Sequence, residues 1–188
     1  MHAELVAVLA AVSLGQPRVL TTRCGQALPA GPFQMLHRSL QAGLRSWVET
    51  QTQHSLGYVE QLYTFGDKGR DAPRAEVGAG AARVVSVGYL ALTRTDAENT
   101  ERLAEAGAHW RDWYGYLPWE DWRQGRPAVL DQAILPALAR WETGVSGDEQ
   151  AARIAGRRAR IRLAFGLGDF PWDEERVLER YELLYEAG

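Results

Sequence analysis

The stretch LPAGPFQMLHRSLQAGLRSWVET, residues 28–50, decides the fold because it leads from a glycine- and proline-rich loop into an amphipathic helix. Its apolar residues recur at the spacing that places them on one face of an α-helix: Leu36, Leu40, Leu44, Trp47 and Val48. The pattern predicts a helix of about 15 residues whose apolar face is buried.

Strand-like segments lie on both sides of this helix. Upstream, ELVAVLAAVSL (residues 4–14) and RVLTTR (residues 18–23) flank a glycine–proline turn, which predicts a hairpin. Downstream, strands are expected at Tyr58–Phe65 and Val84–Leu92, with a long exposed loop at Gly66–Ala82 between them. A further helix is expected at Thr100–Trp110. Mixed strands and helices predict the α/β (α+β) class, arranged as a sandwich.

The composition changes along the C-terminal half. WRDWYGYLPWEDW, residues 110–122, either covers the edge of a core or forms a subunit interface or ligand-stacking wall. An amphipathic helix ending at Gly144 is expected next, with a possible kink at Pro136. Residues 150–165 are then rich in arginine and 173–186 in acids, which predicts two short helices. We expect a main domain at 1–146 and a small helical appendage at 147–188.

Bulk properties exclude several classes of function. A net charge of −3 and a pI near 5.8 argue against a protein that coats nucleic acid non-specifically. The single cysteine, Cys24, excludes an intrachain disulfide framework and fits a reducing cytoplasm. No apolar run reaches the roughly 20 residues that a membrane helix requires. We therefore expect a soluble, cytoplasmic protein without a membrane partner.

The order of hairpin, glycine loop and amphipathic helix, together with LPAGPF, closely resembles the signature region of the Nudix hydrolases. That family places a glycine, then a glutamate six residues on, then Arg-Glu eight residues later, and two more glutamates on the same helix. Here Gly31 stands fourteen residues before Arg45, which is the family spacing, and Glu49 keeps one glutamate. The other glutamate positions hold different residues: His37, Ser46 and Thr50.

Those carboxylates matter because pyrophosphate hydrolysis needs Mg²⁺ held by several oxygens. With Glu49 alone, we expect no metal site, no cofactor and impaired hydrolysis, although whether the chain is an enzyme stays open. Arg45 and Glu49 also have a simpler interpretation as an ordinary i,i+4 pair. The alternative function is an active Nudix hydrolase of nucleoside diphosphate derivatives such as ADP-ribose. In that case Mg²⁺ would be held by Glu49 and a carboxylate outside the helix: Glu60, Glu76 or Glu98.

Two further stretches narrow the resemblance. YVEQLYTFGDKGRD with RVVSVGYLALTR, and WYGYLPWEDWRQGRP with the C-terminal tail, are similar to the Nudix-related transcriptional regulators of bacterial NAD metabolism. The resemblance implies a Nudix sandwich that senses an NAD-derived nucleotide such as ADP-ribose, followed by a winged-helix unit that binds operator DNA as a homodimer. The tail matches only the opening helices of that unit, so we expect the chain to be a fragment of a longer protein.

The resemblance and the topology together suggest contacts. The effector would meet four residues: Arg23, Arg45, Glu49 and Arg70. DNA phosphates would meet three arginines on one helical face, although solvation or pairing with the acidic last helix is an equally simple fate for them: Arg153, Arg157 and Arg160. A third possibility is an interaction module that uses the aromatic stretch and leaves the cleft empty.

Overall fold

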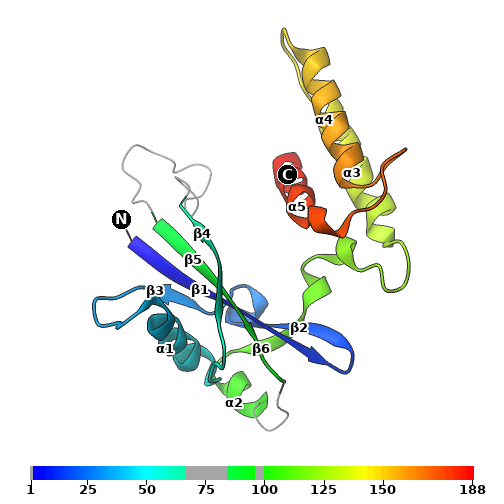
Figure 1. Ribbon diagram of the computed structural model, residues 1–188. Coiled ribbons are helices and arrows are strands. Elements are labelled where there is room, and N and C mark those ends of the chain that lie inside the picture. The colour runs from blue at the N-terminus through cyan, green and yellow to red at the C-terminus, as the bar shows by residue number, and fades with distance from the viewer. Residues whose placement is uncertain (1, 67–83, 96–99) are drawn as a thin grey trace. The chain divides into compact units, whose positions relative to one another are not determined.

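The computed structural model describes residues 2–66, 84–95 and 100–188, and it divides into two compact units, Met1–Trp113 and Tyr114–Gly188 (Figure 1). The division differs from the expected boundary at 146/147. Residues 114–146 belong with the C-terminal helices because Leu130, Ile134 and Leu138 share a core with Ile161 and Leu183. Most of the expected loop at Gly66–Ala82 lies outside the described residues.

Unit 1 is built on a six-stranded mixed sheet. The order is β4-β5-β1-β2-β6, and β3 pairs with β1 off this path. β1 and β5 are parallel, with Leu5 opposite Val87, whereas the other pairs are antiparallel. The expected α+β class is therefore confirmed. The strands are β1 His2–Ser13, β2 Gln16–Thr21, β3 Ala30–Pro32, β4 Glu60–Phe65, β5 Val84–Leu92 and β6 His109–Asp112.

Helix α1 (Leu40–Thr52) packs on one face of this sheet and closes its core. Alternate β1 residues such as Leu5 and Leu9 point toward Leu44 and Val48, and all four are fully buried. The Ser39 side chain caps the helix by accepting a hydrogen bond from the Ala42 amide at 3.1 Å. The prediction that Leu36 belongs to the helical stripe is wrong. It precedes the cap and is 91% exposed.

Two connections show how local conformation sets the topology. The predicted hairpin is confirmed: β1 and β2 join through Leu14 and Gly15, which both have positive φ (51° and 72°). The expected helix Thr100–Trp110 is too long. α2 covers only Thr100–Glu105, and Gly107 turns the chain with φ of 71°. The residues that follow form β6, which pairs with β2 and places Trp110 opposite Leu20.

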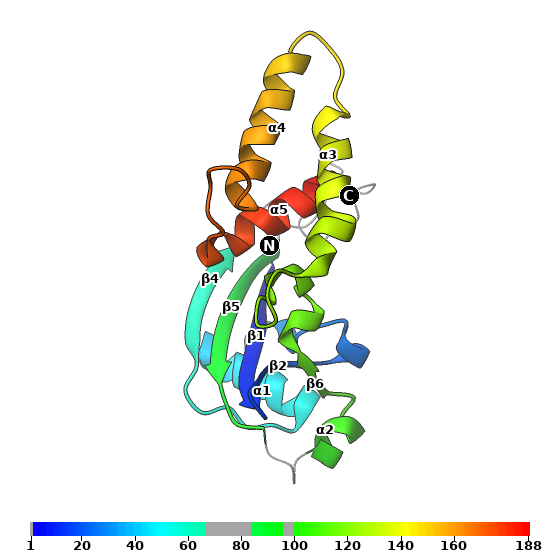
Figure 2. The ribbon, with the colours of Figure 1, turned by 90° about the vertical axis from the view of Figure 1, so that its right-hand side faces the viewer.

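Unit 2 is helical. α3 (Leu135–Thr143), α4 (Gln150–Ala164) and α5 (Val177–Ala187) contact one another, with α3 and α4 side by side (Figure 2). A π-helical turn, Leu130–Ile134, runs directly into α3, and Pro136 follows two residues after that turn. Trp119 and Trp122 of the aromatic stretch pack against the core of unit 2, so the core-edge interpretation holds for these two residues.

A buried ion pair holds unit 2 together. Arg180 has 0% relative exposure and donates to both Glu120 carboxylate oxygens, at 2.6 and 2.8 Å. Its remaining N–H groups donate to the carbonyls of Ala164 and Asp173 at 2.9 and 2.8 Å, and its guanidinium lies 4.0 Å from the Trp172 ring centre. One side chain thus ties α4, α5 and the turn at Pro118–Glu120 (a 3-10 helix) together.

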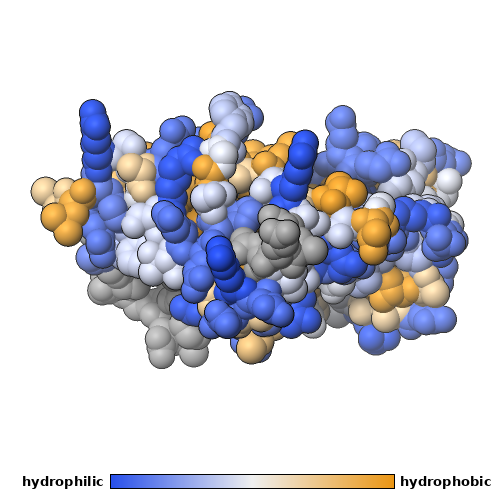
Figure 3. All heavy atoms as spheres, turned by 90° about the horizontal axis from the view of Figure 1, so that it is seen from below, coloured by the Kyte–Doolittle hydropathy of each residue, from blue (hydrophilic) through white to orange (hydrophobic). Residues whose placement is uncertain are grey.

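The surface carries exposed apolar side chains, including Leu14, Met35 and Leu36. On the face seen from below, hydrophilic residues in blue separate several orange patches (Figure 3). This view therefore gives no continuous apolar surface from which to infer a docking face. Within the described residues, no helix is long and apolar enough to cross a membrane.

Candidate functional site

A pocket of about 600 Å³ opens in unit 1 beside the turn that follows β2. Its volume is within the range of small-molecule sites. The lining comes from the start of β1, the turn after β2, β3, the end of α1 and the turn after α2. The residues are Glu4, Thr22, Arg23, Cys24, Ala27, Leu28, Ala30, Gln51, Ala106 and Gly107.

The turn from Thr22 to Ala27 presents Arg23 to this pocket. The two end residues bond each other's backbone, with amide-to-carbonyl distances of 2.8 and 3.3 Å. Between them, Arg23 and Cys24 have φ of 49° and 59°, a left-handed conformation that costs energy in residues other than glycine. Arg23 is exposed, and within the described residues its guanidinium has no hydrogen bond or ion pair. Its five N–H donors are therefore available for an anion.

Gln51 fixes the end of α1 to this pocket. Its amide nitrogen donates to the Ala30 carbonyl at 2.6 Å, and its amide oxygen accepts from the Ala30 amide at 3.2 Å. Across the pocket, a Glu4 carboxylate oxygen accepts from the Ser86 hydroxyl at 3.4 Å. Gln51 and Glu4 thus fix the pocket wall through these hydrogen bonds. Neither contact is predicted from the sequence, because nothing in a sequence pattern indicates which partner a single polar side chain will bind.

Gly31, the glycine of the signature, is required for packing. An added Cβ there would lie 2.3 Å from the Trp47 ring, far inside van der Waals contact. The Trp47 indole N–H donates to the Pro32 carbonyl at 2.9 Å, which locks the ring across the backbone of β3. Gly31 therefore allows Trp47 of α1 to lie directly against β3.

Arg45 is engaged in the structure of unit 1. Its guanidinium donates to the carbonyls of Leu56 and Gly57, the second at 2.6 Å. No ion pair joins it to Glu49 within residues 2–66, 84–95 and 100–188, so the i,i+4 interpretation finds no support there. Neither residue lines the pocket beside Arg23. Arg70, the fourth expected effector contact, lies outside the described residues, as do Glu76 and Glu98.

The residues present at the signature positions do not fit a magnesium ion. Glu49 is exposed, the Thr50 hydroxyl donates to the Ser46 carbonyl at 2.7 Å, and the His37 Nδ1 atom accepts from the Gln34 amide at 3.1 Å. In the part of the chain that the structure describes, no three His, Cys, Asp or Glu side chains gather closely enough to hold a metal. Magnesium needs well-placed oxygens, so this donor set gives no geometry from which a metal-dependent step follows.

The three arginines predicted to contact DNA all lie on α4 but differ in what they bind. Arg157 donates to the Trp141 carbonyl and stacks over that ring at 4.0 Å, whereas Arg160 forms a two-pronged ion pair with Glu186 at 2.6 and 2.8 Å. Hydrogen bonding to Glu186 raises the pKa of Arg160, and hydrogen bonding to Arg160 lowers the pKa of Glu186. Arg153 is exposed and has no side-chain partner among the described residues.

Fold and site together describe an α+β domain with an arginine-bearing pocket beside a helix poor in carboxylates. No family model and no curated protein matches the sequence. Among solved structures, the chain is similar to the NUDIX domain of Shewanella oneidensis NrtR complexed with ADP ribose: 23% identity and a TM-score of 0.48, over 74% of this chain and 86% of that one.

Two more NrtR structures from the same organism are similar. One is NrtR itself, with 21% identity and a TM-score of 0.49, over 76% of this chain and 64% of that one. The other is NrtR complexed with a 27mer DNA, with 18% identity and a TM-score of 0.47, over 94% and 95% of the two chains. The fold assignment rests on the strand order and register given above, not on these likenesses.

Proposed function

We propose that unit 1 is a nucleotide-sensing domain of Nudix type with impaired hydrolysis, and that it binds an NAD-derived nucleotide such as ADP-ribose. The observation that carries the proposal is Arg23, an exposed guanidinium with no partner among the described residues, held by a strained turn at the edge of a pocket of about 600 Å³. Guanidinium groups bind phosphate oxygens in a planar, two-pronged geometry. A diphosphate is therefore the group that this pocket is suited to hold.

We expect impaired hydrolysis because α1 and the segment before it carry few groups that could hold a metal ion. Glu49 is the only signature carboxylate that remains, while the Thr50 hydroxyl donates to the Ser46 carbonyl and the His37 Nδ1 atom accepts from the Gln34 amide. A nucleotide bound at the pocket would thus meet a cation that orients its phosphates but no carboxylate cluster that activates water. Binding without turnover is what a sensor needs.

As a sensor, the domain would act by shifting a population. A ligand changes an equilibrium between two arrangements only by its difference in affinity for them. The turn at Arg23 and Cys24 is a suitable element, because a phosphate that bonds Arg23 would favour the turn conformation presented here. The sequence resemblance supports the further proposal that this equilibrium belongs to a homodimeric transcriptional regulator that binds operator DNA.

Unit 2 would belong to the DNA-binding part of that regulator. Its arginines differ in how many N–H donors they have available for DNA phosphates. Arg153 keeps its donors for phosphate, whereas Arg160 must give up Glu186 and Arg157 must leave Trp141. We expect Arg153→Ala to weaken DNA binding and reduce its salt dependence by about one charge, and Arg160→Ala to do so less. Fluorescence anisotropy with duplex DNA over a salt series measures both.

The sensor is tested by calorimetric titration of the protein with ADP-ribose, without and with Mg²⁺. We expect wild type to bind, and Arg23→Ala to weaken binding by about tenfold or more, since a hydrogen bond to a charged group contributes about 1.5–3 kcal/mol. Arg94→Ala, another exposed arginine of unit 1 that does not line this pocket, is the matched control. Equal binding by Arg23→Ala and wild type would exclude this pocket as the effector site.

Turnover is measured on the same protein. With ADP-ribose and Mg²⁺ we expect little or no AMP and ribose phosphate to appear. If the protein hydrolyses ADP-ribose rapidly and Glu49→Gln abolishes this activity, the protein is an active hydrolase and the proposal of impaired hydrolysis is wrong. If the protein binds none of ADP-ribose, NAD and ATP, both the sensor and the hydrolase hypotheses are wrong, and the hypothesis of an interaction module remains.

A further inference from the structure

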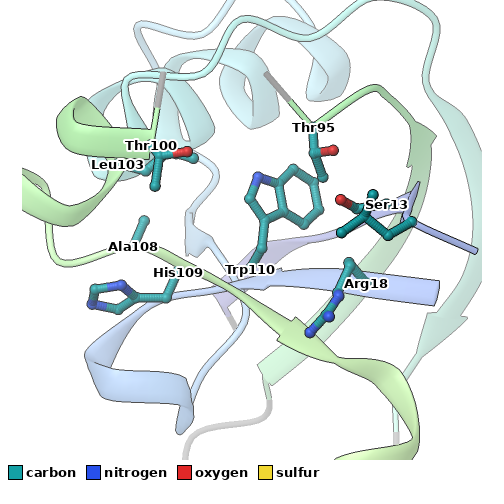
Figure 4. Close-up of a pocket in the computed structure, with 9 residues that line it drawn as sticks. Ser13, Arg18, Thr95, Thr100, Leu103, Ala108, His109 and Trp110 are labelled. Carbon is teal, nitrogen blue, oxygen red and sulfur yellow. The ribbon is translucent and has the colours of Figure 1, made fainter. Parts of the chain in front are cut away.

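A second pocket, of about 550 Å³, lies in unit 1 around Trp110 (Figure 4). It is formed by the end of β1, the start of β2, the segment after β5, α2 and β6. The lining residues are Ser13, Leu14, Arg18, Thr95, Thr100, Leu103, Ala108, His109 and Trp110. It shares no lining residue with the pocket at Arg23, and the proposed function does not use it.

Strand register brings an aromatic ring and a cation together at this pocket. Arg18 pairs with Asp112, and Leu20 pairs with Trp110, so Arg18 and Trp110 are diagonal neighbours on one face of the sheet. That face also carries the core residues of β1, because Arg18 lies opposite Ala11. In Figure 4 the Trp110 ring projects into the pocket between the Thr95 and Thr100 side chains, with Arg18 on the Ser13 side.

Trp110 is held in place rather than free to rotate. It packs against the core of unit 1, and its ring meets the His54 ring edge-on, with centroids 6.2 Å apart. His54 is itself buried, and its Nε2 atom lies 2.9 Å from the Thr93 hydroxyl. A half-buried indole with a fixed orientation is a preformed stacking surface, so a planar ligand would not bear the cost of ordering it.

Arg18 is half-buried and has no side-chain hydrogen bond or ion pair among the described residues. Asp112 lies across the strand pair from it, but no ion pair joins the two and Asp112 does not line the pocket. Because Arg18 is partly desolvated and makes no ion pair among the described residues, it attracts an anion more strongly than a fully solvated guanidinium does. The hydroxyls of Ser13 and Thr95 add donors and acceptors on the Arg18 side of the ring (Figure 4).

We propose that this pocket is a second ligand site and that it takes a nucleoside monophosphate. The base would stack on Trp110, the single phosphate would meet Arg18, and the hydroxyl side chains would bond the sugar between them. The pocket volume suits one nucleotide. Base stacking on an aromatic side chain contributes about 1–3 kcal/mol in nucleic-acid complexes, so ring and phosphate contribute comparably.

The test is calorimetric titration of the full chain with AMP, adenosine and inorganic phosphate. We expect AMP to bind, with Arg18→Ala weakening it by about tenfold or more. Arg94→Ala, an exposed arginine that lines neither pocket, should leave AMP binding unchanged. Adenosine and phosphate alone should each bind at least about tenfold more weakly than AMP, because each lacks one of the two contacts. Far-UV circular dichroism confirms that Arg18→Ala folds.

Three outcomes overturn the proposal: no AMP binding, AMP binding that Arg18→Ala keeps, or inorganic phosphate that binds as well as AMP. If AMP binding disappears in Arg23→Ala and persists in Arg18→Ala, the second site is rejected while the effector pocket is supported. Trp110→Phe, which keeps a smaller ring, should weaken AMP but not phosphate. An equal loss of both would show that the ring only shapes the fold.

Discussion

Replacing Arg180 by methionine tests how unit 2 is stabilised. The guanidinium is fully buried, makes two charge-assisted bonds to Glu120, donates to two backbone carbonyls and stacks over Trp172. Methionine keeps much of the volume but leaves a carboxylate of 9% exposure without its counter-charge. Breaking a buried pair from one side costs about 3–5 kcal/mol. That is a large share of the stability of a small unit, typically about 5–15 kcal/mol for a whole domain.

Urea unfolding followed by circular dichroism and tryptophan fluorescence measures the loss. We expect Arg180→Met to lower the midpoint of the unit 2 transition strongly, whereas the double variant with Glu120→Leu recovers most of the loss, since no charge is then left buried. Arg126→Met, which breaks the exposed pair with Asp131, is the matched control and should cost less than about 1 kcal/mol. A cost for Arg180→Met as small as that of the control would refute the argument from burial.

Two further predictions concern packing and acid stability. Gly31→Ala should destabilise unit 1 by about 1–3 kcal/mol in urea unfolding, because its Cβ would overlap the Trp47 ring, whereas Gly57→Ala, which has open space, should be near neutral. The lowered pKa of Glu186 makes its pairing with Arg160 stabilising above the ordinary glutamate value of about 4.3. That contribution is lost as pH falls through the lower folded value. The pair is exposed, so comparing wild type with Glu186→Gln across this range should show a difference below about 1 kcal/mol.

The sequence predicts α1 and four strands, β1, β2, β4 and β5, because local patterns of apolar and β-forming residues mark them. It does not predict β3, which lies in the glycine- and proline-rich loop, or β6, which lies in a segment expected to be helical. The errors arise where tertiary contacts override the local pattern. The residues around Trp110 fit a helical period. In the structure, however, the chain turns at Gly107 and the residues that follow pair with the edge of β2 as a strand.

Contacts of single polar side chains, in the pocket and in the core of unit 2, were harder to predict, because the type of a side chain does not reveal what it binds. Arg180 stood in a segment dominated by acids and looked like one more surface charge, and nothing in the spacing linked it to Glu120, sixty residues away. The hydrogen bond from Gln51 to the Ala30 carbonyl could not be predicted for the same reason. Long-range hydrogen bonds of single residues leave no periodic trace, so only the folded backbone shows them.

Arginines that look alike in sequence separate into two groups by how their donors are used. Arg45 and Arg180 give their N–H groups to backbone carbonyls or a carboxylate, so removing either exposes unsatisfied groups and should appear mainly as lost stability. Arg18 and Arg23 give theirs to no described residue, so removing either should appear mainly as lost anion binding. Arg18 lies within the six-residue strand β2, Arg23 lies two residues beyond its end, and each lines a separate pocket.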